Sequence, residues 1–111
     1  MNIGIDIVDN KRIATKIKKV AFLKKVLSEK ELEKYNSIKN KQSRIEFAAG
    51  RFSAKEAIIK ATNKSLLFHK LEIINSISGM PEVYYEEKRR KDIFLSISHE
   101  RKTSVSVAII T

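Results

Sequence analysis

The sequence contains no cysteine, and this absence excludes disulfide bonds, zinc–thiolate sites and thiol nucleophiles. Tryptophan is also absent, and aromatic residues make up only 7% of the chain. No apolar run approaches the roughly 20 residues that a membrane-spanning helix needs. The first residues have neither the basic nor the apolar segment of a signal peptide, so we expect a cytoplasmic protein with no membrane association.

Negative charge is scarce relative to positive charge. The 111 residues include 23 Lys and Arg but 13 Asp and Glu, which gives a formal net charge of +10. The length fits one domain spanning residues 1–111 and is too short for a large two-domain enzyme. The charge favours a polyanionic partner: nucleic acid, an acidic protein or a phosphorylated small molecule.

The first residues have the pattern of a β-strand. Apolar Ile3, Ile5 and Ile7 alternate with the residues between them, which predicts a strand with the isoleucines on one face. Asp6 then projects from the opposite face, beside Gly4.

Helical patterns follow. Residues 11–26 have apolar residues at three- and four-residue steps and a densely basic remainder, which predicts one helix. Ser28 and Glu31 form a capping box that predicts the start of a short helix. Residues 42–62 predict a long helix, and Gly50 within it indicates that another part of the chain packs closely there.

The C-terminal half has strand patterns. Residues 71–74, 82–85, 94–99 and 103–110 predict strands, while the charged residues 86–92 predict a solvated turn or one helical turn. Three residues join the last two strands, so these two should be antiparallel. The order of a strand, helices and several further strands predicts an α+β fold.

Four residues suggest chemistry. Asp6 is the only charged residue in an apolar strand, Glu56 and Lys60 share one face of the long helix, and His99 ends a strand. Each also has an ordinary explanation: a solvent-facing acid, a surface ion pair and a structural histidine. Together they fit a magnesium–phosphate site, because magnesium takes one or two carboxylates and completes its shell with water and phosphate. Asp6 and Glu56 would be its ligands if the helix packs across the strand, and Lys60 would contact phosphate.

Four blocks of sequence resemble holo-acyl-carrier-protein synthase, the small single-domain type of 4′-phosphopantetheinyl transferase. They cover nearly the whole chain, and the second block is long and specific. The blocks are Gly4-Ile5-Asp6-Ile7-Val8, Phe47-Ala48-Ala49-Gly50-Arg51-Phe52-Ser53-Ala54-Lys55-Glu56-Ala57, Gly79-x-Pro81 and Ser96-Ile97-Ser98-His99.

The resemblance implies an enzyme of fatty acid biosynthesis. It would transfer the 4′-phosphopantetheine group of coenzyme A to a serine of apo acyl carrier protein and release 3′,5′-ADP. Magnesium would be held by Asp6 and Glu56, which with Lys60 would be the catalytic residues. The serine proton would go to a metal-bound hydroxide or a nearby carboxylate, and the residues do not decide between them. The implied coenzyme A contacts are Lys60, Gly79, Pro81 and His99.

The resemblance also implies partners. The family is usually a homotrimer with each active site between two subunits, and its first helix docks the acidic carrier protein. A protein of charge +10 would be steered toward such a partner. The implied docking residues are Arg12, Lys16, Lys19, Phe22 and Lys25.

Two departures from the family pattern concern the coenzyme A site. The family often has a Gly-rich loop after the helix lysine, whereas residues 62–65 contain no glycine. Asn63 there could adopt a left-handed conformation, and Lys64 could still contact a phosphate. Glu100 also puts a negative charge directly after His99, and we expect it to point away from the ligand.

Two alternatives remain at the level of sequence. A small basic nucleic-acid-binding domain would have the same size and charge. However, no aromatic pair like that of an RNP motif lies on a strand, and aromatic residues are few, so we do not expect nucleic acid as the partner. An inactive relative that serves only as a scaffold is the other alternative, and the glycine-free loop is the feature that favours it.

Overall fold

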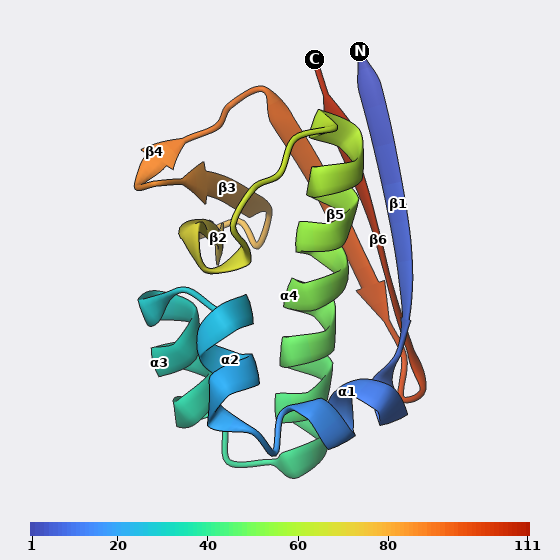
Figure 1. Cartoon of the computed structure of the whole chain (residues 1–111), viewed down its shortest axis with the longest axis vertical. Helices are drawn as coiled ribbons and strands as arrows, with labels where there is room; N and C mark the ends of the chain where they lie inside the picture. The colour runs from blue at the N-terminus through green and yellow to red at the C-terminus, as the bar shows by residue number, and fades with distance from the viewer.

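The computed structural model describes residues 1–111 and has one long helix, α4, at its centre. Figure 1 shows α4 lying along a three-stranded antiparallel sheet of order β1-β6-β5, with the small sheet β2-β3-β4 and helices α2 and α3 on its other side. The elements are β1 (Asn2–Asp9), α1 (Asn10–Lys16), α2 (Val20–Val26), α3 (Glu29–Ser37), α4 (Lys41–Thr62), the 3-10 turn η1 (Phe68–Lys70), β2 (Leu71–Asn75), β3 (Pro81–Tyr85), β4 (Lys88–Arg89), β5 (Ile93–His99) and β6 (Thr103–Ile110).

Strand β1 has two different faces. Gly4 and Val8 are buried, whereas Ile3, Ile5 and Ile7 are 69%, 59% and 71% exposed. Asp6 shares the inward face with Gly4, because side chains in a strand alternate with a period of two. The predicted alternation of the strand is therefore confirmed, and its three isoleucines lie on the outer face of the sheet.

Gly4 brings strand β1 into backbone contact with helix α4. A Cβ atom at this position would overlap the carbonyl oxygen of Ala57 and lie 2.8 Å from the backbone nitrogen of Ala61. Only glycine permits this distance. At Gly50, where the sequence predicted close packing, an added Cβ would lie 3.4 Å from a side-chain methyl group of Ile97, so the tightest approach occurs at Gly4.

Hydrogen bonds of buried polar side chains fix helix α4 to strand β6 and the start of α1 to the β5–β6 turn. The hydroxyl groups of Ser53 on α4 and Ser106 on β6 lie 2.6 Å apart. Asn10 is buried, and its Nδ2 donates to the carbonyl oxygens of Glu100 and Arg101 at 3.0 and 3.2 Å. The turn that follows His99 is therefore held against the start of α1.

Two local predictions were wrong. Residues 11–26 form two helices rather than one, because Lys19 is extended (φ −98°, ψ 119°) and acts as the N-cap of α2. The break allows Ile13 of α1 and Leu23 of α2 to enter the same buried cluster. The charged segment 86–92 contains β4, which follows a tight turn at the two positive-φ residues Glu86 and Glu87.

The other predicted helices and strands are confirmed. Ser28 and Glu31 form the capping box of α3, Asn63 ends α4 in a left-handed conformation (φ 54°), and β5 pairs antiparallel with β6. None of the helices combines the length and the apolar character that a membrane crossing requires.

Replacing Gly4 with alanine tests the contact between β1 and α4. We expect Gly4→Ala to lower the free energy of unfolding by about 1–3 kcal/mol or more, because the new methyl group meets backbone atoms that cannot move independently. Gly50→Ala is the matched control and should leave stability unchanged or raise it by up to about 1 kcal/mol through helix propensity. Urea denaturation measures both, and equal stability of Gly4→Ala and the native chain would contradict the packing argument.

Candidate active site

Asp6 and Lys60 meet at the contact between β1 and α4. The Nζ atom of Lys60 lies 3.3 Å from Oδ1 of Asp6 and donates to the carbonyl oxygen of Ile5 at 3.1 Å. The side chain of Asp6 is only 15% exposed. A nearly buried carboxylate and a lysine that reaches it from the helix therefore form one polar site.

Glu56 provides a second carboxylate near this site. It lies one turn before Lys60, so the two residues belong to the same face of α4. Its side chain is half-buried and makes no hydrogen bond or ion pair within the chain. No three or more His, Asp or Glu side chains converge at a possible metal site. Two carboxylates, one of them without a partner in the chain, fit magnesium, which takes few protein ligands and keeps water and phosphate oxygens.

A pocket of about 740 Å³ lies on another side of α4 and contains the other group of predicted residues. Gly79, Pro81 and His99 line it together, although they come from the β2–β3 turn, from β3 and from β5. Nδ1 of His99 lies 3.4 Å from Oε1 of Glu46, so a carboxylate lies beside the imidazole at the pocket wall.

Arg51 lines the same pocket and was not predicted as a site residue. Its side chain is 12% exposed, and its guanidinium carbon lies 4.6 Å from the centre of the Phe47 ring. Burial lowers the pKa of Arg51, and the nearby carboxylate of Glu31 partly opposes that shift. The only signal in the sequence was its position beside Gly50 in the longest block of the resemblance.

The two groups of residues point in different directions. Arg51 and Lys60 are nine residues apart on α4, which corresponds to about 13 Å along the axis and about half a turn around it. The pocket with Arg51 therefore lies on one side of the helix, and Asp6 with Lys60 lies on the other. A ligand that contacts both groups must span two sides of α4 or bind between two copies of the chain.

The predicted docking residues lie on α1 and α2 and on the turn between them. Arg12, Lys19 and Lys25 are exposed. The Nζ atom of Lys16 lies 5.6 Å from the centre of the Phe22 ring, and Phe22 is half-buried with its ring centre 6.0 Å from that of Phe52. The lysines and Arg12 therefore form a basic surface, and Phe22 supports it from the apolar cluster beneath.

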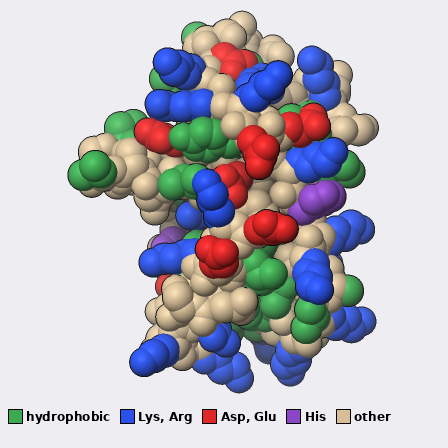
Figure 2. Space-filling model, turned by 90° about the vertical axis from the view of Figure 1, so that its left-hand side faces the viewer, with side chains coloured by type: hydrophobic (Ala, Val, Ile, Leu, Met, Phe, Trp, Pro, Cys, Tyr) green, Lys and Arg blue, Asp and Glu red, His purple; other side chains and the backbone are tan.

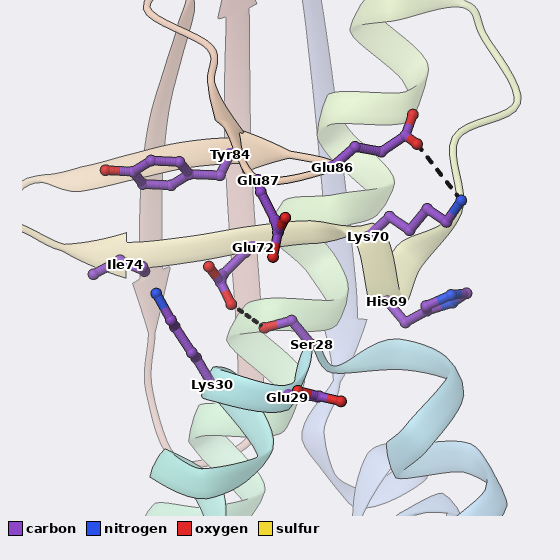
Figure 3. A pocket seen from close by; sticks show the side chains of 10 residues that line it. All are labelled: Ser28, Glu29, Lys30, His69, Lys70, Glu72, Ile74, Tyr84, Glu86 and Glu87. Atoms are coloured by element: carbon purple, nitrogen blue, oxygen red, sulfur yellow. Dashed lines mark hydrogen bonds and ion pairs between the residues drawn. The ribbon is translucent and has the colours of Figure 1, made fainter.

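A second pocket, of about 660 Å³, contains none of the predicted residues. Figure 2 shows acidic side chains across the middle of this face, and Figure 3 shows the pocket with Ser28 donating to Glu72 at 2.7 Å. Although Lys30 and Lys70 also line it, the pocket does not suit the phosphates of coenzyme A, because these would be repelled by its four carboxylates. They belong to Glu29, Glu72, Glu86 and Glu87.

Residues 2–110 match the sequence profile of the 4′-phosphopantetheinyl transferase superfamily. The chain belongs to this family. A holo-[acyl-carrier-protein] synthase of Mycoplasma capricolum subsp. capricolum is 44% identical over 108 residues, covering 97% of this chain and 92% of the relative. The predicted family and enzyme class, a holo-[acyl-carrier-protein] synthase, are thereby confirmed.

Solved structures of 4′-phosphopantetheinyl transferases support the fold. The holo-(acyl-carrier-protein) synthase of Bacillus anthracis str. Ames, in complex with CoA (3′,5′-ADP), superimposes with a TM-score of 0.86 at 30% identity, covering 98% of this chain and 94% of that one. The Helicobacter pylori enzyme in complex with coenzyme A gives 0.81 at 28% identity, covering 98% and 99%. The predicted α+β fold is confirmed.

Lys64 and Glu100 are the two charged residues that the sequence placed at the edges of the candidate site. Lys64 follows the left-handed Asn63 and is exposed, with no bond from its side chain. Glu100 is turned into the β5–β6 turn, where its Oε1 accepts from the backbone nitrogen of Lys102 at 2.9 Å. Its carboxylate is therefore held within the turn, and its orientation relative to a bound ligand stays a prediction.

Proposed function

We propose that the protein transfers the 4′-phosphopantetheine group from coenzyme A to a serine of apo acyl carrier protein. The serine oxygen forms a bond to the β-phosphorus, the bond from that phosphorus to the α-phosphate breaks, and 3′,5′-ADP leaves. The observation that carries the proposal is the pairing of the nearly buried Asp6 with Lys60, one turn from the unpaired Glu56. Transfer between phosphates needs positioning and charge neutralisation, and these residues supply both.

Asp6 and Glu56 are the proposed magnesium ligands. A bound magnesium ion would neutralise charge on the pyrophosphate of coenzyme A. Lys60 would contact a phosphate oxygen as a flexible point charge. Its ammonium group lies between Asp6 and a backbone carbonyl, beside one of the proposed metal ligands. Lys64, exposed beyond the end of the same helix, would approach the same phosphates.

The pocket with Gly79, Pro81 and His99 is the proposed site for the adenosine end of coenzyme A. The pyrophosphate must lie at Asp6 and Glu56, so the phosphate left for this pocket is the 3′-phosphate of the ribose. Arg51, Lys34 and His99 are the side chains lining it that can carry positive charge beside that phosphate.

The proposed assembly is a homotrimer with each active site between two subunits. It is supported by the division of the site residues between two sides of α4 and by the exposed Ile3, Ile5 and Ile7 of β1. Contiguous apolar surface of this kind commonly marks a protein interface. The basic surface of Arg12, Lys16, Lys19, Phe22 and Lys25 is the proposed docking site for the acidic carrier, and the cytoplasmic location stays a prediction.

Removing either proposed metal ligand tests the reaction. We expect Asp6→Asn and Glu56→Gln each to lower kcat by about two to three orders of magnitude, because charge on the pyrophosphate is no longer neutralised. The exposed Glu86→Gln is the matched control and should keep full activity. Mass gain of an apo carrier protein measures transfer, and a chelator should abolish it until magnesium is restored. A native chain that produces no mass gain would support the inactive-scaffold alternative.

Charge reversal on α1 tests carrier docking. We expect Arg12→Glu to raise KM for the carrier by about tenfold or more while KM for coenzyme A stays within about twofold, because the lost attraction involves only the acidic protein. Lys88→Glu, an exposed lysine on β4, is the control for the change in net charge. Equal effects of the two variants on KM for the carrier would contradict a specific docking surface.

Mixed assemblies test whether two subunits share each site. Asp6→Asn and Arg51→Gln should both be impaired alone, and unfolding and refolding them together should restore roughly a quarter of native activity, because one interface in four then combines intact Asp6 with intact Arg51. Either variant refolded alone is the control. No recovery in the mixture would mean that each site lies within one chain.

A further inference from the structure

A buried carboxylate joins three elements beneath the proposed adenosine pocket. The side chain of Glu31 on α3 is 2% exposed. Its Oε1 accepts from the backbone nitrogen of Ser28 at 2.9 Å and from Nζ of Lys55, and its Oε2 accepts from the backbone nitrogen of Ile73 at 2.9 Å. The carboxylate is therefore satisfied by hydrogen bonds that do not involve Arg51.

Lys55 on α4 is the principal counter-ion of Glu31. It is fully buried, and its three ammonium hydrogens have three acceptors, which are Oε1 of Glu31 and the carbonyl oxygens of Val26 at 2.8 Å and Phe68 at 2.9 Å. Lys55 has no donor left for a ligand. The Glu31–Lys55 pair is thus complete within the protein.

Arg51 is the second cation beside Glu31 but remains without hydrogen bonds. Its Nε lies 3.5 Å from Oε2 of Glu31, and this buried nitrogen has no hydrogen-bond partner. The terminal guanidinium nitrogens donate to no group of the chain, and the side chain, 12% exposed, lines the pocket with His99. An arginine packed on Phe47 thus presents unused donors to this pocket.

The charges in this cluster do not cancel. Arg51 and Lys55 carry two positive charges, and Glu31 carries one negative charge. Glu72 is the other carboxylate near Lys55, but it accepts from Ser28 and faces the pocket in Figure 3. One positive charge is left, and the arginine that carries it is the cation with access to a ligand.

We infer that Lys55 is a positioning residue for substrate recognition: by pairing with Glu31, it keeps the charge and the donors of Arg51 available to a phosphate of coenzyme A. This inference rests on the proposed function. Without Lys55, the nearest cation to the carboxylate would be Arg51, and a guanidinium group pairs readily with a carboxylate through two parallel hydrogen bonds. Glu31 would then occupy the donors that the phosphate needs.

The test compares binding of 3′,5′-ADP with binding of 5′-AMP, which lacks the 3′-phosphate. Calorimetry gives the ratio of the two Kd values for each chain. We expect Lys55→Met to lower this preference by about tenfold, since Glu31 then captures Arg51. The double variant E31Q/K55M should recover the preference to within about threefold of native, because the competing carboxylate has gone. A role in stability alone would weaken both ligands equally, so the ratio of the two Kd values would stay unchanged in Lys55→Met.

The single variant Glu31→Gln keeps the inference falsifiable if Lys55→Met does not fold. Breaking a buried pair destabilises more than removing both charges, so thermal unfolding is measured for every variant. We expect Glu31→Gln to keep or raise the preference for 3′,5′-ADP. Any of three results would overturn the inference. These are a collapse of the preference in Glu31→Gln, an unchanged preference in folded Lys55→Met, and no preference in the native chain. If the native chain transfers phosphopantetheine but folded Lys55→Met keeps its preference for 3′,5′-ADP, the inference is overturned and the proposed function stays intact.

Discussion

The backbone contact at Gly4 is the constraint on which the arrangement of this protein depends. Strand β1 can lie directly on α4 only because residue 4 has no side chain. That contact sets the depth of Asp6, two residues further on the same face, and puts it within reach of Lys60. The same helix carries Arg51 to the pocket on its opposite side and holds Lys55 buried beneath it, so one strand–helix contact fixes the position of both polar regions relative to the sheet.

Much of this fold could be predicted from the sequence, because its helices and strands have strong local signals. The capping box at Ser28, the left-handed Asn63 and the alternation in β1 each depend on neighbouring residues alone. The break near Lys19 could not be predicted in this way, because the pattern of residues 11–26 suits one helix. It follows from the need to bury side chains of both α1 and α2 in one cluster, which is a property of the tertiary structure.

The candidate site was predictable to a similar extent. Asp6, Glu56 and Lys60 stood out because charge is rare in a strand and pairs at four residues share a helix face. Arg51 and Glu31 gave no such signal, since one is a basic residue in a basic chain and the other has an evident role in a helix cap. Their relation appears only when α3 packs against α4, and the hydrogen bonds that satisfy Glu31 come partly from the backbone nitrogens of Ser28 and Ile73.

The outer face of β1 has a consequence for how the activity depends on protein concentration. Three exposed isoleucines lie side by side on an edge strand of the sheet, and covering them requires an encounter with other molecules. Association of this kind follows mass action. If the site is completed only in the assembly, specific activity is not a constant of the protein but falls on dilution.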